Sequence, residues 1–327
     1  MNRFWEETLS TAVKVASGYA GSYSMTRIIG RQLSEGPLRR RVVMVVPAAG
    51  RLQHVADGSI DLGWSIPAIE AKWAMEGRGP GYTTPLPNLR AVARFPQNDR
   101  FMAAAAPWSG ITRLAQIAEA KRPLRIAVRV NPGEGYGWFE NKIFARYGFS
   151  LDDVVAWGGR HWSVGTHVGS IQREVEARAV DLVVGEASTQ PIWAYLAANG
   201  FRFLSLDQQV VDALVREEGM EPNTVPAGFL PGISEPLLSI DESDFVLVVR
   251  DSAEDQLIYE IARIIDENRR RIEEGAVMVE YNYTKQLPIP ELTLRSPLTG
   301  PIAEFWRTPI PLHAAAERYY RERGYLK

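Results

Sequence analysis

Apolar positions near the start of the chain follow first the period of a strand and then that of a helix. Residues 13–17 alternate and are rich in valine, which predicts a strand. Residues 18–23 contain two glycines and predict a loop. A helix is predicted by apolar residues at helical spacing, Met25, Ile28, Ile29 and Leu33. This order aims the first-turn N–H groups of the helix at the carboxyl end of the strand and favours an anion site there; a plain strand-to-helix connection is the alternative.

Strand-like and helix-like segments alternate to the end of the chain. Further strands are predicted at residues 42–46, 60–64, 89–94, 124–130, 154–157, 180–184 and 245–249. Helices are predicted at residues 51–56, 66–75, 138–147, 168–177, 258–272 and 313–323. The plan of the first part recurs, because the shift from residue 13 to residue 125 and the shift from residue 42 to residue 154 are both 112. We therefore expect two lobes with the same local plan.

This alternation predicts an α/β fold with mainly parallel sheets covered by helices. The expected division is residues 1–106 and 225–327 for lobe I with the C-terminal helices, 107–224 for lobe II, and a hinge near 101–107 and 204–249. Residues 245–249 are expected to pair beside residues 101–106. In such sheets ligands bind beyond the carboxyl ends of the strands. The loops at residues 18–23 and 133–137 are therefore expected to face each other across a cleft.

Composition and charge exclude several classes of function but indicate none directly. A net charge of -2 and a pI near 6.2 give no basic field for nucleic acid, so no nucleic-acid partner is expected. The absence of cysteine removes disulfides and thiolate chemistry. The first residues carry acid where a signal peptide needs an apolar core, and no apolar run reaches membrane-spanning length. On these grounds no export signal or membrane anchor is expected.

Sequence motifs for the common cofactors and nucleophiles are missing. There is no dinucleotide fingerprint, no phosphate-binding P-loop and no Gly-x-Ser-x-Gly elbow, so no cofactor and no metal are expected. His161 and His167 lack the spacing of a metal pair. The acid pair at Asp152 and Asp153 follows Ser150 and is interpreted as helix capping. Asp61 and Asp181 occupy matching strand positions, which favours a shared structural role.

Aromatic and arginine side chains are the better candidates for ligand contacts. Tyrosines and tryptophans cluster in or just after loops at predicted strand ends: Tyr19, Tyr23, Trp64, Tyr136, Trp138, Trp157 and Trp162. Core packing is the commoner explanation for any one of them, but together they suggest a partly aromatic pocket. Arg94 and Arg129 end predicted strands and are suited to bidentate pairing with a carboxylate, the alternative being ordinary salt bridges.

The C-terminal segment carries a resemblance to a known family. Residues 310–324 include Pro311-Leu312-His313 and Tyr319-Tyr320, and this pattern resembles the C-terminal signature of the TAXI-type solute-binding proteins of TRAP (tripartite ATP-independent periplasmic) transporters. Residues 58–63, similar to Gly-x-x-Asp-Leu-Gly, and residues 225–232, similar to Ile-Pro-Ala-Gly-x-Tyr-Pro-Gly, follow the same family in order. The resemblance spans nearly the whole chain.

That resemblance implies a periplasmic-binding-protein-like clamshell whose two α/β lobes close on a small organic carboxylate, possibly aromatic, without catalysis. The family's ligand loops fall on residues 18–23 and 132–136. The ligand-binding residues expected on this basis are Tyr19, Ser22, Tyr23, Trp64, Arg129, Glu134, Gly135, Tyr136, Trp162 and Ser188. Glu134 and Tyr136 depart from the family's Pro-Gly-Ser-Gly-Thr loop, and a carboxylate there competes with an anionic ligand.

The resemblance implies TRAP membrane permease subunits as partners and the periplasm as location. The expected lack of an export signal argues against that location. Two alternatives stay open at this stage. One is a lyase-like enzyme on the same two-lobed fold, with Glu134 or His161 as general base. The other is a cytosolic sensor that reports ligand occupancy to a partner protein.

Overall fold

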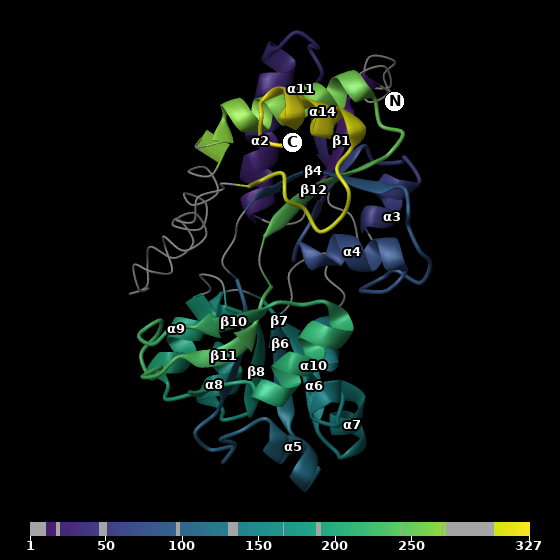
Figure 1. Ribbon diagram of the computed structural model, residues 1–327. Helices are drawn as coiled ribbons and strands as arrows, with labels where there is room; N and C mark the ends of the chain where they lie inside the picture. The colour runs from purple at the N-terminus through teal and green to yellow at the C-terminus, as the bar shows by residue number, and fades with distance from the viewer. Residues whose placement is uncertain are drawn as a thin grey trace, which may run out of the picture. The chain divides into compact units, whose positions relative to one another are not determined.

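The computed structural model describes residues 11–17, 20–45, 51–95, 99–129, 137–165, 167–187, 191–242, 244–269, 271–272 and 304–327. The chain divides into two compact units, which are described separately (Figure 1). Among the described residues, unit 1 comprises those in 11–95, 244–272 and 304–327, and unit 2 those in 99–242. The division therefore falls near residues 97 and 242. The apolar segment at residues 101–106 belongs to unit 2, which places the first boundary earlier than expected.

Unit 1 is built on a five-stranded mixed sheet. In spatial order its strands are β2 (Val42–Val45), β1 (Val13–Ala16), β3 (Leu62–Ser65), β12 (Phe245–Arg250) and β4 (Leu89–Phe95). β1 is parallel to β2 and β3, whereas β12 is antiparallel to both β3 and β4. Four strands therefore run in one direction and β12 runs in the other. β12 follows unit 2 in the sequence.

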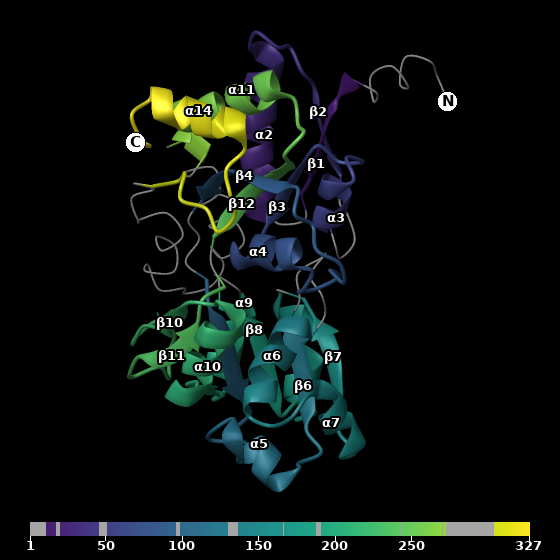
Figure 2. The ribbon, with the colours of Figure 1, turned by 45° about the vertical axis from the view of Figure 1, so that its right-hand side comes forward.

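Helices cover both faces of this sheet (Figure 2). One face packs under α2 (Ala20–Glu35), α11 (Asp255–Glu267) and α14 (Ala314–Glu322), and the other under α3 (Arg51–Ala56) and α4 (Ile69–Glu76). Successive side chains of β12 point to opposite faces of the sheet. Leu247 and Val249 pack in the core under α2, α11 and α14, whereas Val246 and Val248 pack in the core under α3 and α4. All four side chains are buried, which is why β12 is a continuous apolar run.

Unit 2 repeats the plan of unit 1. Its five-stranded sheet has the order β7 (Arg160–Val164), β6 (Arg125–Arg129), β8 (Leu182–Glu186), β5 (Phe101–Ala105) and β9 (Arg202–Leu204). β6 is parallel to β7 and β8, and β5 is antiparallel to β8 and β9. The inserted antiparallel strand is therefore fourth in both sheets. This confirms the predicted two-lobed α/β fold with mainly parallel sheets.

The remaining elements of unit 2 surround this sheet. Its helices are α5 (Ala115–Ala120), α6 (Trp138–Arg146), α7 (Leu151–Ala156), the 3-10 helix η1 (Val168–Ser170), α8 (Gln172–Glu176), α9 (Pro191–Ala198) and α10 (Gln208–Glu218). A two-stranded hairpin, β10 (Pro222–Val225) and β11 (Leu237–Ile240), completes it. α8 and α9 pack on one face of the sheet through Val175 and Trp193, whereas α6 packs against α10.

Several sequence-based expectations about elements were wrong. Residues 154–157 are not a strand, because α7 runs from Leu151 to Ala156 after a capping box at Ser150, and the strand of this position is β7. Residues 245–249 pair with β3 and β4 and not beside residues 101–106. The apolar pattern of residues 42–46 predicts a buried parallel strand. β2 is parallel, but it lies at the edge of the sheet, where Met44 is exposed.

Candidate functional site

The carboxyl end of β1 leads directly to the N-terminus of α2. α2 begins at Ala20, so Ser22 and Tyr23 lie in its first turn and not in a loop before the helix, as the glycines had suggested. The Ser17 and Ser22 hydroxyl oxygens are 2.8 Å apart and both side chains are buried. The Ser17 N–H donates to the Val45 carbonyl at 3.0 Å, which extends the β1–β2 pairing by one residue. Strand end and helix start are thus joined through one serine pair.

Electrostatically, the start of α2 favours an anion. The first N–H groups of a helix have no intrahelical acceptor and lie at the positive end of the dipole. α2 is 16 residues long and has no acidic side chain in its first turn. Tyr23 keeps 36% of its surface exposed there. The Tyr23 phenol in this turn adds a partly exposed hydroxyl group that can donate to an anion.

Trp64 has a packing role in this structure. Its side chain is fully buried in unit 1, and its indole N–H donates to the Thr26 hydroxyl on α2 at 2.8 Å. The ring makes edge contacts with Phe95 and Phe245, with centroid distances of 5.3 and 6.2 Å. The expectation that Trp64 lines the ligand site overlooked that β3 is covered by helices on both faces. Trp64 is therefore left out of the site proposed below.

A buried polar network lies just beyond β3. The Arg51 Nε–H donates to the Trp64 carbonyl at 2.7 Å, and an Arg51 Nη2–H donates to Glu70 Oε2 at 2.5 Å. The Tyr82 hydroxyl donates to Glu70 Oε1 at 2.9 Å and accepts the Leu52 N–H at 3.4 Å. Arg51, Glu70 and Tyr82 are each at most 3% exposed.

Burial is the main cause of the raised pKa of Glu70, opposed by the charge of Arg51, and it also raises the pKa of Tyr82. No sequence motif predicts this network. The residues concerned come from separate helices and a loop, and the one available signal was an arginine at the first position of an apolar helix.

In unit 2, the matching strand and helix are β6 and α6. β6 ends at Arg129, whose side chain is not described, and α6 begins after Gly137, which has a positive φ of 69°. α6 differs from α2 because Glu140 stands in its first turn and is buried. Trp162 on β7 is half-buried, with the Arg160 guanidinium 5.0 Å from its ring centroid. The candidates that lie outside the described residues are Tyr19, Glu134, Gly135, Tyr136 and Ser188.

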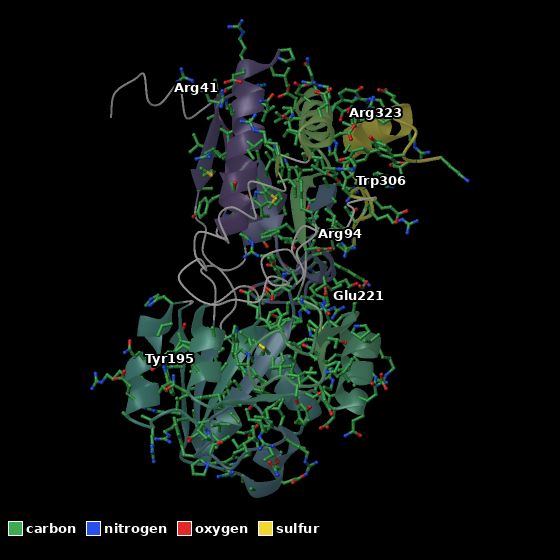
Figure 3. The ribbon with its side chains drawn as sticks, turned by 90° about the vertical axis from the view of Figure 1, so that its left-hand side faces the viewer. Arg41, Arg94, Tyr195, Glu221, Trp306 and Arg323 are labelled. Atoms are coloured by element: carbon green, nitrogen blue, oxygen red, sulfur yellow. The ribbon has the colours of Figure 1, made fainter. Side chains whose placement is uncertain are left out.

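Two other groups of candidate residues have structural partners. Arg94, which is labelled in Figure 3, forms an ion pair with Asp244, so its charge is compensated. The Asp61 and Asp181 carboxylates accept the backbone N–H of Lys14 on β1 and of Arg125 on β6, both at 2.9 Å. This confirms their shared structural role. The capping interpretation of Asp153 is also confirmed by its reciprocal bonds with Ser150.

The described part of the chain contains neither a metal-binding cluster nor a membrane-spanning helix. No cluster of histidine or acidic side chains there has the composition of a metal site. None of the described helices combines the length and the apolar character that a membrane span requires.

Comparison with known families shows where this arrangement belongs. A family model described as the NMT1-like family matches residues 10–324, nearly the whole chain. The chain belongs to the NMT1-like family. A search of curated proteins found no significant match. Neither result confirms the resemblance to TAXI-type proteins, which stays a prediction.

Several solved structures are similar to the chain at low identity. The periplasmic aliphatic sulphonate binding protein SsuA from Escherichia coli is 15% identical over 96% of this chain and 88% of that chain, with a TM-score of 0.45. XAC2383 from Xanthomonas citri is 12% identical over 94% and 98%, with a TM-score of 0.49. PhnD1 from Prochlorococcus marinus, solved with methylphosphonate, is 12% identical over 97% and 99%, with a TM-score of 0.46.

Proposed function

We propose that this member of the NMT1-like family is a solute-binding protein that captures a small organic anion at the carboxyl edges of its two sheets and delivers it to a membrane transporter. The observation that carries the proposal is the pair β1 and α2, in which a long helix without acid in its first turn begins at the end of a central parallel strand. Ligands in open parallel sheets bind at such edges. The second sheet repeats the plan and supplies a second edge of the same kind.

The finer proposal is that the anion is a carboxylate, possibly aromatic. The first-turn N–H groups of α2 provide donors of fixed direction, and the Tyr23 hydroxyl adds one more donor with an aromatic face beside it. Arg129 at the end of β6 is the proposed cationic contact in unit 2. Trp162, Tyr19, Glu134, Gly135, Tyr136 and Ser188 remain proposed contacts from the sequence.

The proposed partners follow the sequence resemblance. A TAXI-type receptor works with TRAP permease subunits in the periplasm, so we propose that location and those partners for this chain. The proposal assigns no bond-making or bond-breaking step to the protein. Conversion of a bound compound by the purified protein would contradict it and support the lyase-like alternative.

Ligand-dependent unfolding tests the proposal directly. A panel of benzoate, phenylacetate, succinate and glutamate is screened by thermal unfolding, with methanesulfonate and methylphosphonate as anions of other geometry. A ligand at about 100 times its Kd stabilises the native state by roughly 2.7 kcal/mol, which is a shift of several degrees. A shift with a carboxylate supports the finer proposal, and a shift with a sulfonate or phosphonate alone limits it to anions. An unmoved curve across the panel counts against anion binding.

Variants at Tyr23 locate the site. In Tyr23→Glu the new carboxylate lies at the positive end of the α2 dipole, where it stabilises the helix by about 0.3–1 kcal/mol but repels an anionic ligand. We therefore expect unchanged or slightly higher Tm without ligand, and loss of the ligand-induced shift. Tyr23→Gln controls for loss of the ring. Tyr195→Phe on α9, labelled in Figure 3, is a matched tyrosine variant in unit 2 and is expected to bind normally.

A further inference from the structure

The buried network of Arg51, Glu70 and Tyr82 connects β3, α3 and α4 at the carboxyl edge of the five-stranded sheet of unit 1. Arg51 is the first residue of α3, and its guanidinium reaches the carbonyl of Trp64 in β3 and that of Ile66 after β3, at 2.7 and 3.4 Å. Through Glu70 the same guanidinium is tied to the first turn of α4. One cation thus fixes where β3 ends relative to the two helices that follow it on this face of the sheet.

This arrangement is more costly than an apolar one. Taking an arginine and a glutamate out of water carries a desolvation penalty that the ion pair repays only partly, and apolar residues of similar volume often serve stability as well or better. The pair is at most 3% exposed on both sides. What the polar network provides in return is direction, because the guanidinium donates in fixed directions to the Trp64 carbonyl and Glu70 while Tyr82 fixes the other oxygen of Glu70.

We infer that Arg51, Glu70 and Tyr82 are positioning residues, which hold residues 62–68 in the conformation needed for ligand binding without touching the ligand. The inference rests on the proposed function, since that function places the ligand at this edge. Ser65 follows the same logic, because its hydroxyl donates to the Pro67 carbonyl at 3.1 Å within the segment that the network holds. Stability alone does not require a charged network here, whereas a binding edge requires a fixed backbone.

The test removes the whole network and separates position from stability. In the triple variant Arg51→Met, Glu70→Leu, Tyr82→Phe, no buried charge is left without a partner, so we expect cooperative unfolding to be retained. Hydrogen exchange of the amides in residues 62–68 is expected to rise at least tenfold, while α11 and α14, which do not pair with β3, exchange as in the unmodified chain. With benzoate as the probe, well below Tm, Kd is expected to rise at least tenfold. Arg31→Gln, Glu35→Gln removes an exposed ion pair on α2 and is the control.

Each outcome decides between positioning and packing. Exchange in residues 62–68 within twofold of the unmodified chain overturns the inference, as does an unchanged Kd for benzoate. If benzoate does not bind the unmodified chain, the proposed ligand class is wrong, and the exchange measurement alone decides on the network. If the triple variant does not fold, Tyr82→Phe is used, for which a rise of about threefold in the exchange of the same amides is expected and no local change overturns the inference.

Discussion

The two matching aspartates allow a comparison of one substitution in two settings. Asp61 and Asp181 each precede a central strand, and each accepts a backbone N–H from the neighbouring parallel strand, β1 or β6, at 2.9 Å. Their other contacts differ. Asp181 also accepts two side-chain bonds from Arg125, at 2.8 and 2.7 Å, whereas the nearest cation to Asp61 is the Arg250 guanidinium at 4.0 Å. Replacing each aspartate by alanine should therefore lower the free energy of unfolding by different amounts.

The expected magnitudes follow from the number of bonds and the exposure of each carboxylate. The Asp181 side chain is 12% exposed and the Asp61 side chain 35%. A hydrogen bond to a charged group contributes about 1.5–3 kcal/mol when buried and less when exposed. The part from Arg125 is discounted to about 0.5–1 kcal/mol because that side chain is 35% exposed. We expect Asp181→Ala to cost about 3 kcal/mol and Asp61→Ala about 1 kcal/mol.

Urea unfolding of each variant measures this difference. With a slope of about 2 kcal/mol/M, the midpoint should fall by about 1.5 M for Asp181→Ala and about 0.5 M for Asp61→Ala. Each substitution is expected to act on the transition of its own unit. The double variant Arg125→Met, Asp181→Ala isolates the side-chain pair, for which we expect a coupling of about 0.5–1 kcal/mol. Equal costs for the two aspartates would refute the reasoning, because their backbone bonds are alike and only their surroundings differ.

Two further predictions concern unit 1. Burial lowers the pKa of His313, whose Nδ1 accepts the Ala315 N–H at 3.2 Å, so the unfolded chain binds a proton more readily below about pH 6.5. Stability should fall from that pH downward by up to about 1.4 kcal/mol per pH unit, and His313→Asn, which keeps a capping acceptor, should reduce this slope in unfolding measured from pH 7 to 5. In Gly63→Ala the new Cβ meets Val55 Cγ2 at 2.8 Å, so we expect a cost of about 1–3 kcal/mol in urea unfolding, whereas Gly165→Ala, with no neighbour nearer than 3.6 Å, should be close to neutral.

Local sequence patterns predicted the central elements well because the buried strands are strongly apolar. β1, β6 and β8 lie where valine-rich segments indicated, and the internal shift of 112 residues relates β1 to β6 in the structure. The second pair of that comparison, from residue 42 to residue 154, related β2 to α7 and was wrong. Residues 154–157 are apolar enough for a strand, but the capping box at Ser150 starts a helix at Leu151 that includes most of them.

Strand pairing was harder to predict than strand location. The apolar pattern of β12 predicts a buried strand but does not say to which of the two sheets it belongs. Only the tertiary structure shows that it lies between β3 and β4. The same limit applies to the candidate site. Aromatic residues at strand ends are typical of both a pocket and a core, and Trp64 belongs to the core because helices cover both faces of its sheet.

The residues of the C-terminal signature have structural partners in unit 1. The Ala91 N–H on β4 donates to the Pro311 carbonyl at 2.9 Å, and the His313 N–H donates to the Ala91 carbonyl at 2.9 Å, so this segment pairs with the outer edge of the sheet. The hydroxyls of the two signature tyrosines donate to the Val92 carbonyl and to Asp266, each at 2.8 Å.

The signature residues therefore attach the C-terminal segment to β4 and α11. A relative with the same attachment is expected to have the same signature, whatever ligand it binds. A resemblance of this kind is strong evidence for the fold and weak evidence for the ligand. Ligand identity depends instead on the ends of β1 and β6 and the helices that follow them, where α2 and α6 already differ in their first-turn acids. A carboxylate in the first turn of α6 and none in that of α2 means that the two edges are not equivalent, so we expect the anionic group of a ligand to bind at α2.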